Sequence, residues 1–381
     1  MARVAIGIEN VHRRGGQERV VCELLWRLAD RHDIDLICYQ AEDIPADRVR
    51  VVPVADCVRF SQFLRALWFI PACAPPARRG GYDVILAQGS NMWRPNFVVA
   101  HTCHAQRIRN RRRGEWRRHP PAWGDRAQYA VRDRIMYALE RRIMRRCRGN
   151  IIAIDEVCKR ELQQAYGLGD DEVVVCENGV DHEAFHPGLR ARWREPVRRE
   201  LGLTDDEFVV LFMGGLWHEK GLPLLIEALP LMHEQAKLVV VGRGDEDEYG
   251  RRGEALGVRD RVIFAGFAPQ PERYFAMADC FAFLSEAEGL ALVQLEAAAC
   301  GLPLVLLKDY APPPLVEDGV SGFLAPADPA ALAPKLDALA ADPDFRRRAG
   351  AASHQRSLHY SWDRQANEIE AFLLERIGGR R

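Results

Sequence analysis

The sequence predicts an α/β protein made of two Rossmann-like domains, and three observations lead to this prediction. The chain has 381 residues, which is too long for one ordinary compact domain and typical of two. Short apolar runs alternate with longer segments of helical periodicity along the whole chain, as in strand–helix–strand units. These runs are apolar on both faces, which is typical of parallel strands that helices cover on both sides.

The first half of the chain supplies one sheet and its helices. Val20, Leu24 and Leu28 recur at helical spacing and indicate an amphipathic helix after the first strand. The strands are expected at 3–8, 34–39, 84–87, 97–101, 150–154 and 173–176, and the clearest helices at 17–31 and 128–146.

The second half repeats the pattern and ends in an additional helix at 363–376. This last helix has Ile369, Phe372 and Leu373 on one face, and we expect the segment 362–381 to pack back onto the first domain. The strands are expected at 208–213, 237–241, 262–265, 280–284 and 303–306, and the helices at 222–232, 271–278, 291–300, 328–341 and 344–357.

A turn-rich segment marks the boundary between the domains. Residues 177–181 form a turn cluster after a strand, and His186-Pro187-Gly188 closes the segment. We therefore place the first domain at 1–180 and the second at 181–361, with a cleft between them. Ligands of open parallel sheets bind beyond the carboxyl ends of the strands, so the loops there are the candidate sites.

Charge divides the chain at the same place. The formal net charge is −1, but the residues through Val180 carry 30 basic and 22 acidic side chains, a net of +8, and the remainder carries −9. This division indicates two domains that face different partners.

The cysteines and the apolar runs favour a cytoplasmic protein. None of the ten cysteines stands in a CxxC pair, and Cys22 and Cys280 lie in apolar runs, where a thiol packs as a small hydrophobe. The chain starts with the strand-like run 4–8 rather than a basic and apolar leader. No apolar run approaches the roughly 20 residues that a membrane-spanning helix needs.

The loop and helix after the strand at 280–284 carry the most informative residues. Glu288 lies in the loop and Glu296 lies two turns into the helix. The start of the helix presents free amides and a positive dipole end, at which phosphate binds well. Carboxylates on either side would accept hydrogen bonds from sugar hydroxyls. The alternative is a pair of surface glutamates around an amphipathic helix.

Glu288, Glu296 and the following Gly301-Leu302-Pro303 resemble the E-x7-E and G-x-P signature of the retaining, GT-B-fold nucleotide-sugar glycosyltransferases of family 4. The resemblance implies that Glu288 binds the donor sugar and Glu296 the ribose of the nucleotide. It also implies that the diphosphate is held by the intervening backbone amides, at Gly289, Leu290, Ala291 and Leu292.

Four further segments match motifs of that family in the same order, so the resemblance covers nearly the whole chain. It implies that the second domain binds the donor and the first the acceptor. The segments are Gly15-Gly16-Gln17-Glu18-Arg19, Asn178-Gly179-Val180-Asp181, the run from Gly214 to Gly221, and Gly322-Phe323-Leu324.

Lys220 and the Gly15-Gly16 pair also have physical reasons to matter. Lys220 lies on a turn before a helix start, where its charge would neutralise a diphosphate leaving group. Gly15 and Gly16 precede the first helix and allow a phosphate or an acceptor to approach the backbone closely. Arg19 follows on the same helix. The alternatives are a solvated lysine and an ordinary loop.

Two positions depart from the family pattern. Gly215 stands where the family usually has an arginine, so one cation for the diphosphate is missing. The candidates to replace it are His218, Arg19 and Arg243. Ala291 stands where the family often has glycine, and its Cβ would restrict the approach of a phosphate to the amides.

Two histidines follow the apolar run at 97–101. We assign His101 to the far side of the donor sugar and His104 to the acceptor side, because the family often has a histidine in this region. The alternative is that each caps the end of a strand. His101-x-Cys103-His104 also suggests zinc, but no second pair of ligands stands at zinc-like spacing, so no metal is expected.

The segment Arg107–Arg148 concentrates positive charge, with 15 arginines against four acidic residues, a net of +11. Each basic residue near an anionic membrane is worth about 1 kcal/mol. Trp116, Trp123 and Tyr129 are interleaved with the arginines, so we expect an anionic membrane surface as a partner rather than merely solvated helix faces. No nucleic-acid motif accompanies the charge, so nucleic acid is not expected.

The segment from His101 to Ala105 and the basic stretch after it resemble the bacterial lipopolysaccharide-core glucosyltransferases within family 4. This narrower resemblance implies a glycan or glycolipid acceptor and a peripheral location at the inner face of the membrane.

The full set of motifs implies a retaining, metal-independent hexosyltransferase. It would use a nucleotide-diphospho-sugar as cosubstrate, with a UDP-sugar favoured, and no cofactor. Two alternatives stay open: an epimerase or phosphorylase of the same two-domain plan, and a degenerate homologue that binds membranes or nucleic acid.

Overall fold

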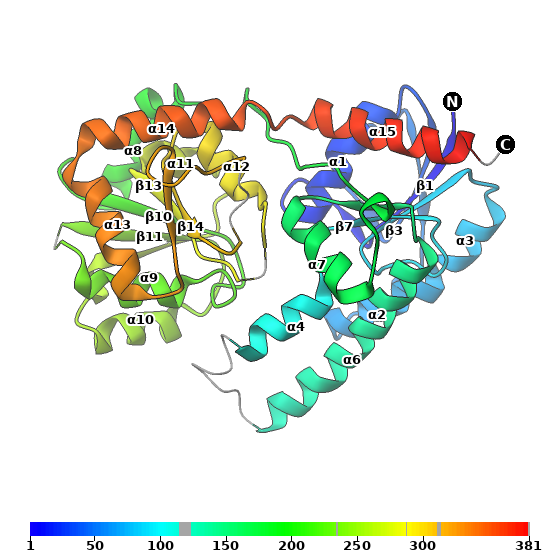
Figure 1. Ribbon diagram of the computed structural model, residues 1–381, viewed down its shortest axis with the longest axis horizontal. Coiled ribbons are helices and arrows are strands. Elements are labelled where there is room, and N and C mark those ends of the chain that lie inside the picture. The colour runs from blue at the N-terminus through cyan, green and yellow to red at the C-terminus, as the bar shows by residue number, and fades with distance from the viewer. Residues whose placement is uncertain (114–122, 234, 287, 311–313, 380–381) are drawn as a thin grey trace. The chain divides into compact units, whose positions relative to one another are not determined.

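The computed structural model describes residues 1–113, 123–233, 235–286, 288–310 and 314–379, which form two compact α/β units (Figure 1). The first unit contains Met1–Arg112, the described chain from 123 up to Asn178, and the C-terminal segment from Trp362. The second unit runs from Gly179 to Ser361.

The first unit is built on a parallel sheet. Its strands are β1 (Arg3–Gly7), β3 (Asp33–Cys38), β5 (Val49–Pro53), β6 (Val84–Gln88), β7 (Phe97–Ala100), β8 (Ile151–Ala153) and β9 (Val173–Val175). Within the described residues they lie in the order β5-β3-β1-β6-β7-β8-β9, and every pair is parallel. The short strands β2 (Asn10–Val11) and β4 (Gln40–Ala41) form a separate parallel pair.

Helices cover both faces of this sheet. Val4 and Ile6 of β1 face α1 and α15, whereas Ala5 belongs to the core that α2, α6 and α7 cover. The helices are α1 (Gly16–Leu28), α2 (Gln62–Ala72), α3 (Ala74–Arg79), α4 (His104–Arg113), α6 (Trp123–Arg146), α7 (Glu156–Tyr166) and α15 (Trp362–Gly378). The alternation of β1 side chains between two apolar faces explains why its run reads as continuously hydrophobic.

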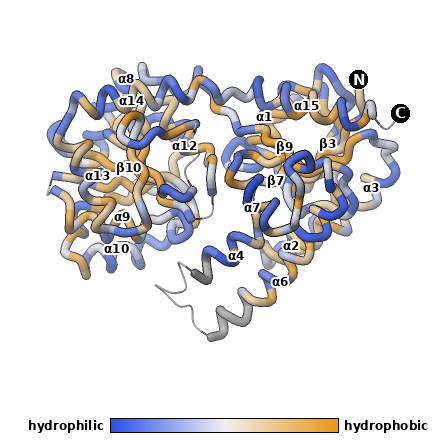
Figure 2. The backbone as a smooth tube through the Cα atoms, in the orientation of Figure 1, coloured by the Kyte–Doolittle hydropathy of each residue, from blue (hydrophilic) through white to orange (hydrophobic). Residues whose placement is uncertain are grey.

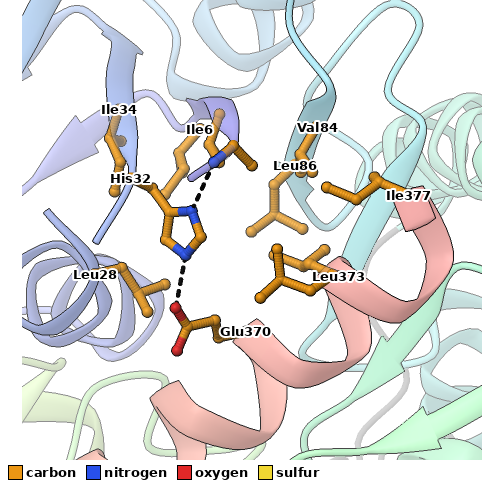
Figure 3. Close-up of a pocket in the computed structure, with 12 residues that line it drawn as sticks. Ile6, Leu28, His32, Ile34, Val84, Leu86, Glu370, Leu373 and Ile377 are labelled. Atoms are coloured by element: carbon orange, nitrogen blue, oxygen red, sulfur yellow. Dashed lines mark hydrogen bonds and ion pairs between the residues drawn. The ribbon is translucent and has the colours of Figure 1, made fainter.

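The C-terminal helix α15 packs against α1 and the sheet. Figure 3 shows the small pocket along this seam, lined by aliphatic side chains of β1, β3, β6 and α15. One polar pair closes it: His32 Nδ1 accepts a hydrogen bond from the Ala2 amide at 3.1 Å, and Nε2 lies 2.7 Å from Glu370 Oε1. Arg31 also pairs with Glu370. These contacts join the later turns of α15 to the amino ends of β1 and β3, whereas its first turn bonds to Asn178, just after β9.

The second unit has the same construction. Its strands are β10 (Phe208–Met213), β11 (Ala236–Val241), β12 (Val262–Gly266), β13 (Cys280–Phe283), β14 (Leu304–Leu307) and β15 (Gly322–Ala325). In the described part of this unit they form one parallel sheet in the order β12-β11-β10-β13-β14-β15.

Alternate residues of β10 again face two cores. Val210 and Phe212 pack with α9 and α13, and Val209 and Leu211 pack with α8, α11 and α12. The helices are α8 (Leu189–Glu200), α9 (Leu222–Ala228), α10 (Glu246–Ala255), α11 (Glu272–Met277), α12 (Leu292–Ala299), α13 (Pro329–Ala341) and α14 (Pro343–Ser357). In Figure 2 hydrophobic positions gather in the strands of this unit.

Each sheet has one point where the direction of winding reverses. In the first unit the chain builds β1, β3 and β5 outward and then places β6 on the other side of β1; in the second, β13 lies on the other side of β10. At such a switch point the loops after two neighbouring strands run in opposite directions. A crevice forms between them, and ligands of α/β sheets bind there.

The structure corrects one predicted helix and adds four strands, β2, β4, β5 and β15, and, in the second unit, the helices α8 and α10. The helix expected at 222–232 ends at Ala228 and gives way to a 3-10 turn at Leu229–Leu231, because Pro230 has no N–H with which to continue the helix. The edge strands β5 and β15 were not predicted. No helix among the described residues is both long and apolar enough to cross a membrane.

Candidate functional site

The loop after β10 approaches the end of β13 very closely. A Cβ on Gly221 would lie 2.4 Å from the carbonyl oxygen of Leu284, and Gly221 has a φ of 82°. Only glycine fits that position without displacement. The Lys220 carbonyl also accepts a hydrogen bond from the Leu284 amide at 3.2 Å. The backbone therefore fixes Lys220 at the switch point between β10 and β13.

The side chain of Lys220 lies over the start of its own loop and beside the predicted glutamate. Its Nζ is 3.7 Å from Glu288 Oε2 and 5.2 Å from the centroid of the Phe283 ring. A Cβ on Gly214 would be 3.2 Å from the same Nζ. The Lys220 and Glu288 side chains are 17% and 32% exposed, so both are accessible to a ligand. The structure thus brings together two residues that lie far apart in the sequence.

The amino end of α12 follows Glu288 in the same loop. Ala291 precedes the helix in an extended conformation, without a side-chain hydrogen bond to cap it, and its carbonyl accepts from the Gln294 amide at 3.0 Å. The amides at Leu292 and Val293 have no acceptor within the helix, as at any helix start. Gly289 and Leu290 are buried in the preceding loop. This end of α12 therefore supplies positive potential next to Lys220.

Glu296 lies one turn into α12 and is only 5% exposed. Gln294, two residues earlier, is 2% exposed, and its Oε1 has no hydrogen-bond partner among the described residues. The sequence analysis missed Gln294, because a glutamine near the start of a helix gives no signal of its burial. Both residues therefore bring buried oxygen acceptors to the first half or middle of α12.

Arg243 lies next to the position where the family arginine is missing. The loop after β11 meets the loop after β10, since a Cβ on Gly242 would lie 2.0 Å from the Gly214 carbonyl oxygen. A Cβ on Gly215 would be 3.9 Å from the Arg243 carbonyl oxygen. The Arg243 guanidinium lies 5.0 Å from the centroid of the Phe267 ring, and Arg243 is exposed. The backbone of Arg243 thus borders Gly215, and its side chain supplies an exposed cation that lies over Phe267.

In the first unit, the Gly15-Gly16 pair begins α1. Gly15 precedes the helix, and a Cβ there would lie 2.2 Å from Glu18 Oε2, whereas a Cβ on Gly16 would meet nothing within 4 Å. The Arg19 amide donates to the Gly15 carbonyl at 3.2 Å. Gly16 therefore leaves open space at the start of the helix, whereas the side chain of Glu18 fills the space beside Gly15.

His101 follows β7 and is bound by a side chain that the sequence analysis missed. Its Nε2 lies 2.8 Å from Oε1 of Gln88, the last residue of β6, which is 2% exposed. Burial lowers the pKa of His101 to about 4, so the ring is neutral near pH 7. Because the amide oxygen only accepts, Nε2 carries the proton and Nδ1 is an acceptor. A polar residue at the end of an apolar run was the available signal for Gln88.

His104 has a backbone role at the start of α4. Its amide and that of Ala105 donate to the two carboxylate oxygens of Glu140 at 2.9 and 3.2 Å, and the Tyr166 hydroxyl also binds Glu140. Glu140 of α6 thus caps α4, and burial raises its pKa. Burial also raises the pKa of the Cys103 thiol to about 12, which keeps it protonated. Among the described residues no three His, Cys, Asp or Glu side chains are grouped as metal ligands.

The basic segment forms α4 and α6, although residues 114–122 and the side chains of 111–128, with Trp116 and Trp123, lie outside the described part. Several of its arginines pack on the first unit. Arg142 lies 4.0 Å from the centroid of the Trp93 ring, and Arg146 donates to the Pro95 carbonyl at 2.9 Å. Part of the charge therefore has a structural role.

Two family models match the chain, one for each half. Residues 14–184 match the family described as Glycosyltransferase Family 4, and residues 194–356 match Glycosyl transferases group 1. The D-inositol 3-phosphate glycosyltransferase of Xylanimonas cellulosilytica is 36% identical over 219 residues, which are 54% of this chain and 52% of that protein. The chain thus spans about half the length of this curated relative.

Two solved structures share the fold over nearly their whole length. WaaG, a glycosyltransferase involved in lipopolysaccharide biosynthesis, superposes with a TM-score of 0.79 at 17% identity, covering 96% of this chain and 98% of that one. Alr3699/HepE of Anabaena, in complex with UDP-glucose, gives a TM-score of 0.73 at 21% identity over 98% and 100% of the chains. At such identities the likeness shows the fold alone, that of two Rossmann-like domains of the GT-B type.

Proposed function

The chain belongs to the GT-B glycosyltransferases of the family 4 and group 1 type, and on that premise we propose that it is a retaining hexosyltransferase. It moves a sugar from a nucleotide-diphospho-sugar to an acceptor hydroxyl. The observation that carries the proposal is the pairing of Lys220 with Glu288, 3.7 Å apart, beside the uncapped amino end of α12.

The second unit is suited to hold the diphosphate without a metal. In this proposal Lys220 and the amides at the start of α12 bind the phosphates, and Arg243 replaces the cation missing at Gly215. A lysine and a helix dipole supply positive charge where the leaving group develops negative charge, so they stabilise the transition state. Glu288 then releases Lys220 to the phosphate and accepts hydrogen bonds from the donor sugar.

Glu296 and His101 take the remaining roles. Glu296 accepts hydrogen bonds from the ribose hydroxyls of the nucleotide, and neutral His101 binds the far side of the donor sugar. Catalysis rests on positioning and leaving-group stabilisation rather than on a protein nucleophile, with attack on the face from which the nucleotide departs. The donor is a UDP-sugar, as in the HepE complex with UDP-glucose.

Calorimetry with UDP tests these roles. Glu296→Ala is expected to weaken UDP binding at least about tenfold, which corresponds to the loss of one hydrogen bond to a charged group. Glu288→Ala is expected to keep UDP affinity and lose turnover of UDP-glucose. Glu227→Ala, which removes a carboxylate paired with Arg252 on the same unit, is the control. Unchanged UDP affinity in Glu296→Ala contradicts the ribose assignment, and loss of binding in EDTA contradicts metal independence.

The acceptor proposed first is a membrane-associated glycan, reached by peripheral attachment of the first unit to the inner face of the membrane. Support comes from an exposed apolar stripe of Phe60, Leu64 and Trp68, four residues apart and 82%, 42% and 39% exposed. The basic helix α6 adjoins α2, since Arg132 lies 5.9 Å from the centroid of Phe63. An apolar stripe beside a basic helix is the pattern of interfacial membrane binding.

Vesicle flotation tests this attachment. The double variant Phe60→Asp/Leu64→Asp is expected to lose binding to vesicles containing anionic lipid, and Leu358→Asp, at a 49% exposed leucine of the second unit, is expected to keep it. Equal binding to the vesicles by the wild type, the double variant and Leu358→Asp contradicts the attachment.

A second acceptor is favoured by the named relative, a D-inositol 3-phosphate glycosyltransferase. A small phosphorylated polyol would be glycosylated in solution, without vesicles. Transfer from UDP-glucose to D-inositol 3-phosphate in a vesicle-free assay supports this acceptor over a membrane glycan.

A further inference from the structure

The first unit has, at its own switch point, a group of amide side chains that the roles above do not use. The switch point lies between β1 and β6, whose register pairs Gly7 with Ala87. Gln88 ends β6, and Asn91 follows it and donates from Nδ2 to the carbonyl of Gly7, the last residue of β1, at 3.1 Å. The end of β6 thus carries Gln88 and Asn91, the end of the neighbouring β7 carries His101, and Asn91 also bonds to the end of β1.

Two polar atoms of this group are buried without a partner. Gln88 is 2% exposed and uses Oε1 for His101, but its Nε2 has no hydrogen-bond partner among the described residues. Asn91 uses Nδ2 for Gly7, but its Oδ1 is equally unpartnered. Leaving such atoms unsatisfied destabilises a folded protein, so native structures rarely do so unless an ordered water or a ligand completes the bonds.

The backbone directly after Gln88 borders open space. A Cβ on Gly89, directly after Gln88, would meet nothing within 4 Å, and the same holds for Gly16 at the start of α1. In the second unit, the equivalent switch point between β10 and β13 holds Lys220 and Glu288. The same architectural position thus carries charged groups in one unit and neutral amides in the other.

We propose that Gln88 and Asn91, together with His101, form a binding site for sugar hydroxyl groups at the β1/β6 switch point. Gln88 Nε2 donates to one hydroxyl oxygen, and Asn91 Oδ1 accepts from one hydroxyl. His101 Nδ1 accepts from another. A hydroxyl both donates and accepts, so polyols satisfy this mixed set, whereas a phosphate oxygen would face Asn91 Oδ1 and His101 Nδ1, two acceptors. The inference rests on the proposed function, and the hydroxyls belong either to the hexosyl group of the donor or to the acceptor.

Titrations of the full chain test the site with three probes: UDP, UDP-glucose, and myo-inositol in the presence of UDP. The variants are Gln88→Met and Asn91→Ser, and the matched control is Gln163→Met. Gln163 is an amide of α7 that bonds to Gly169 and Asp170 near the amino end of β9. Asn91 is only partly buried, so Asn91→Ser gives an answer even where Gln88→Met fails to fold.

The expected result is unchanged UDP affinity in all variants, because UDP has no hexosyl hydroxyls. For a donor-sugar site, the ratio of UDP-glucose to UDP affinity falls about five- to tenfold in both variants, the loss of one neutral hydrogen bond. For an acceptor site, that ratio holds and myo-inositol binding falls by the same factor. Either result supports the site, and the two distinguish the source of the hydroxyls.

The inference is overturned if folded Gln88→Met or Asn91→Ser protein binds UDP-glucose and myo-inositol as Gln163→Met does. It is also overturned if UDP affinity falls in parallel, since the effect is then not on sugar hydroxyls. Failure of the wild-type protein to bind UDP or UDP-glucose would instead contradict the proposed function itself.

Discussion

Lys220→Met is the sharpest test of the donor site. The Lys220 Nζ now lies 3.7 Å from Glu288 Oε2, and a bound diphosphate would take over this charge at a similar distance. Two unit charges about 4 Å apart, at an effective dielectric constant of about 20, attract by about 4 kcal/mol. Since a leaving diphosphate gains charge in the transition state, up to about a thousandfold in kcat/KM depends on this one cation.

The second unit offers a closely matched control. Lys335 Nζ lies 3.7 Å from Asp318 Oδ1 and 5.0 Å from the centroid of Phe323, almost the same contacts as those of Lys220 with Glu288 and Phe283. Lys335→Met therefore removes an equivalent partly exposed ion pair and cation–π contact. We expect both variants to lose at most about 1 kcal/mol of stability.

The assay is release of UDP from UDP-glucose, with UDP affinity measured in parallel. Lys220→Met is expected to lower kcat/KM by a factor of about 100 to 1,000 and Lys335→Met by less than twofold. A loss of less than tenfold in Lys220→Met, or an equal loss in both variants, would refute the assignment of Lys220 to the leaving group.

Three further predictions concern buried polar groups. Asp279→Ala is expected to cost about 3–5 kcal/mol of unfolding free energy, measured by calorimetry, because it leaves the 1% exposed Arg198 without its counter-charge; unchanged stability contradicts this. The depressed pKa of His101, about 4, means that the unfolded state binds its proton first, so stability is fully present above about pH 6.5 and falls as the pH drops towards 4. Urea unfolding of wild type and His101→Gln at several pH values checks this. An equal dependence of the unfolding free energy on pH in both proteins contradicts the prediction. Glu140→Gln is expected to speed amide hydrogen exchange at 104–110, since a neutral amide caps α4 with one acceptor rather than two.

The sequence predicted the strands well wherever an apolar run is continuous, but it did not predict the helices α8 and α10 of the second unit. It did not reveal β5, because this edge strand has the exposed residues Arg50 and Val51 in its centre and lacks the continuous apolar pattern of a buried strand. Arg50 is held by the buried Asp35 of β3, a pairing that depends on which strands are neighbours. The break of the helix at Pro230, in contrast, was readable from proline chemistry alone.

The candidate site was predictable in its residues but not in its geometry. Spacing and resemblance identified Lys220 and Glu288, yet their contact depends on β10 and β13 being neighbours across the switch point, which no local pattern states. The role of Gln88 was missed for the same reason, since its hydrogen bond to His101 joins β6 to β7. Glu140 was counted only as a charge in a basic segment, although its partners on α4 lie 35 residues or more away.

The two switch points differ in charge in the way that a transferase of two dissimilar substrates requires. In the proposed function the diphosphate carries formal negative charge, and Lys220, Arg243 and the start of α12 are the groups of the second unit proposed to bind it. The hydroxyls of a sugar are neutral and gain nothing from a full charge, while a desolvated cation there would attract the diphosphate to the wrong unit. Neutral His101 and the free atoms of Gln88 and Asn91 avoid that competition. The low pKa of His101 is thus consistent with a site that distinguishes a polyol from a phosphate, because a protonated imidazole would bind either one.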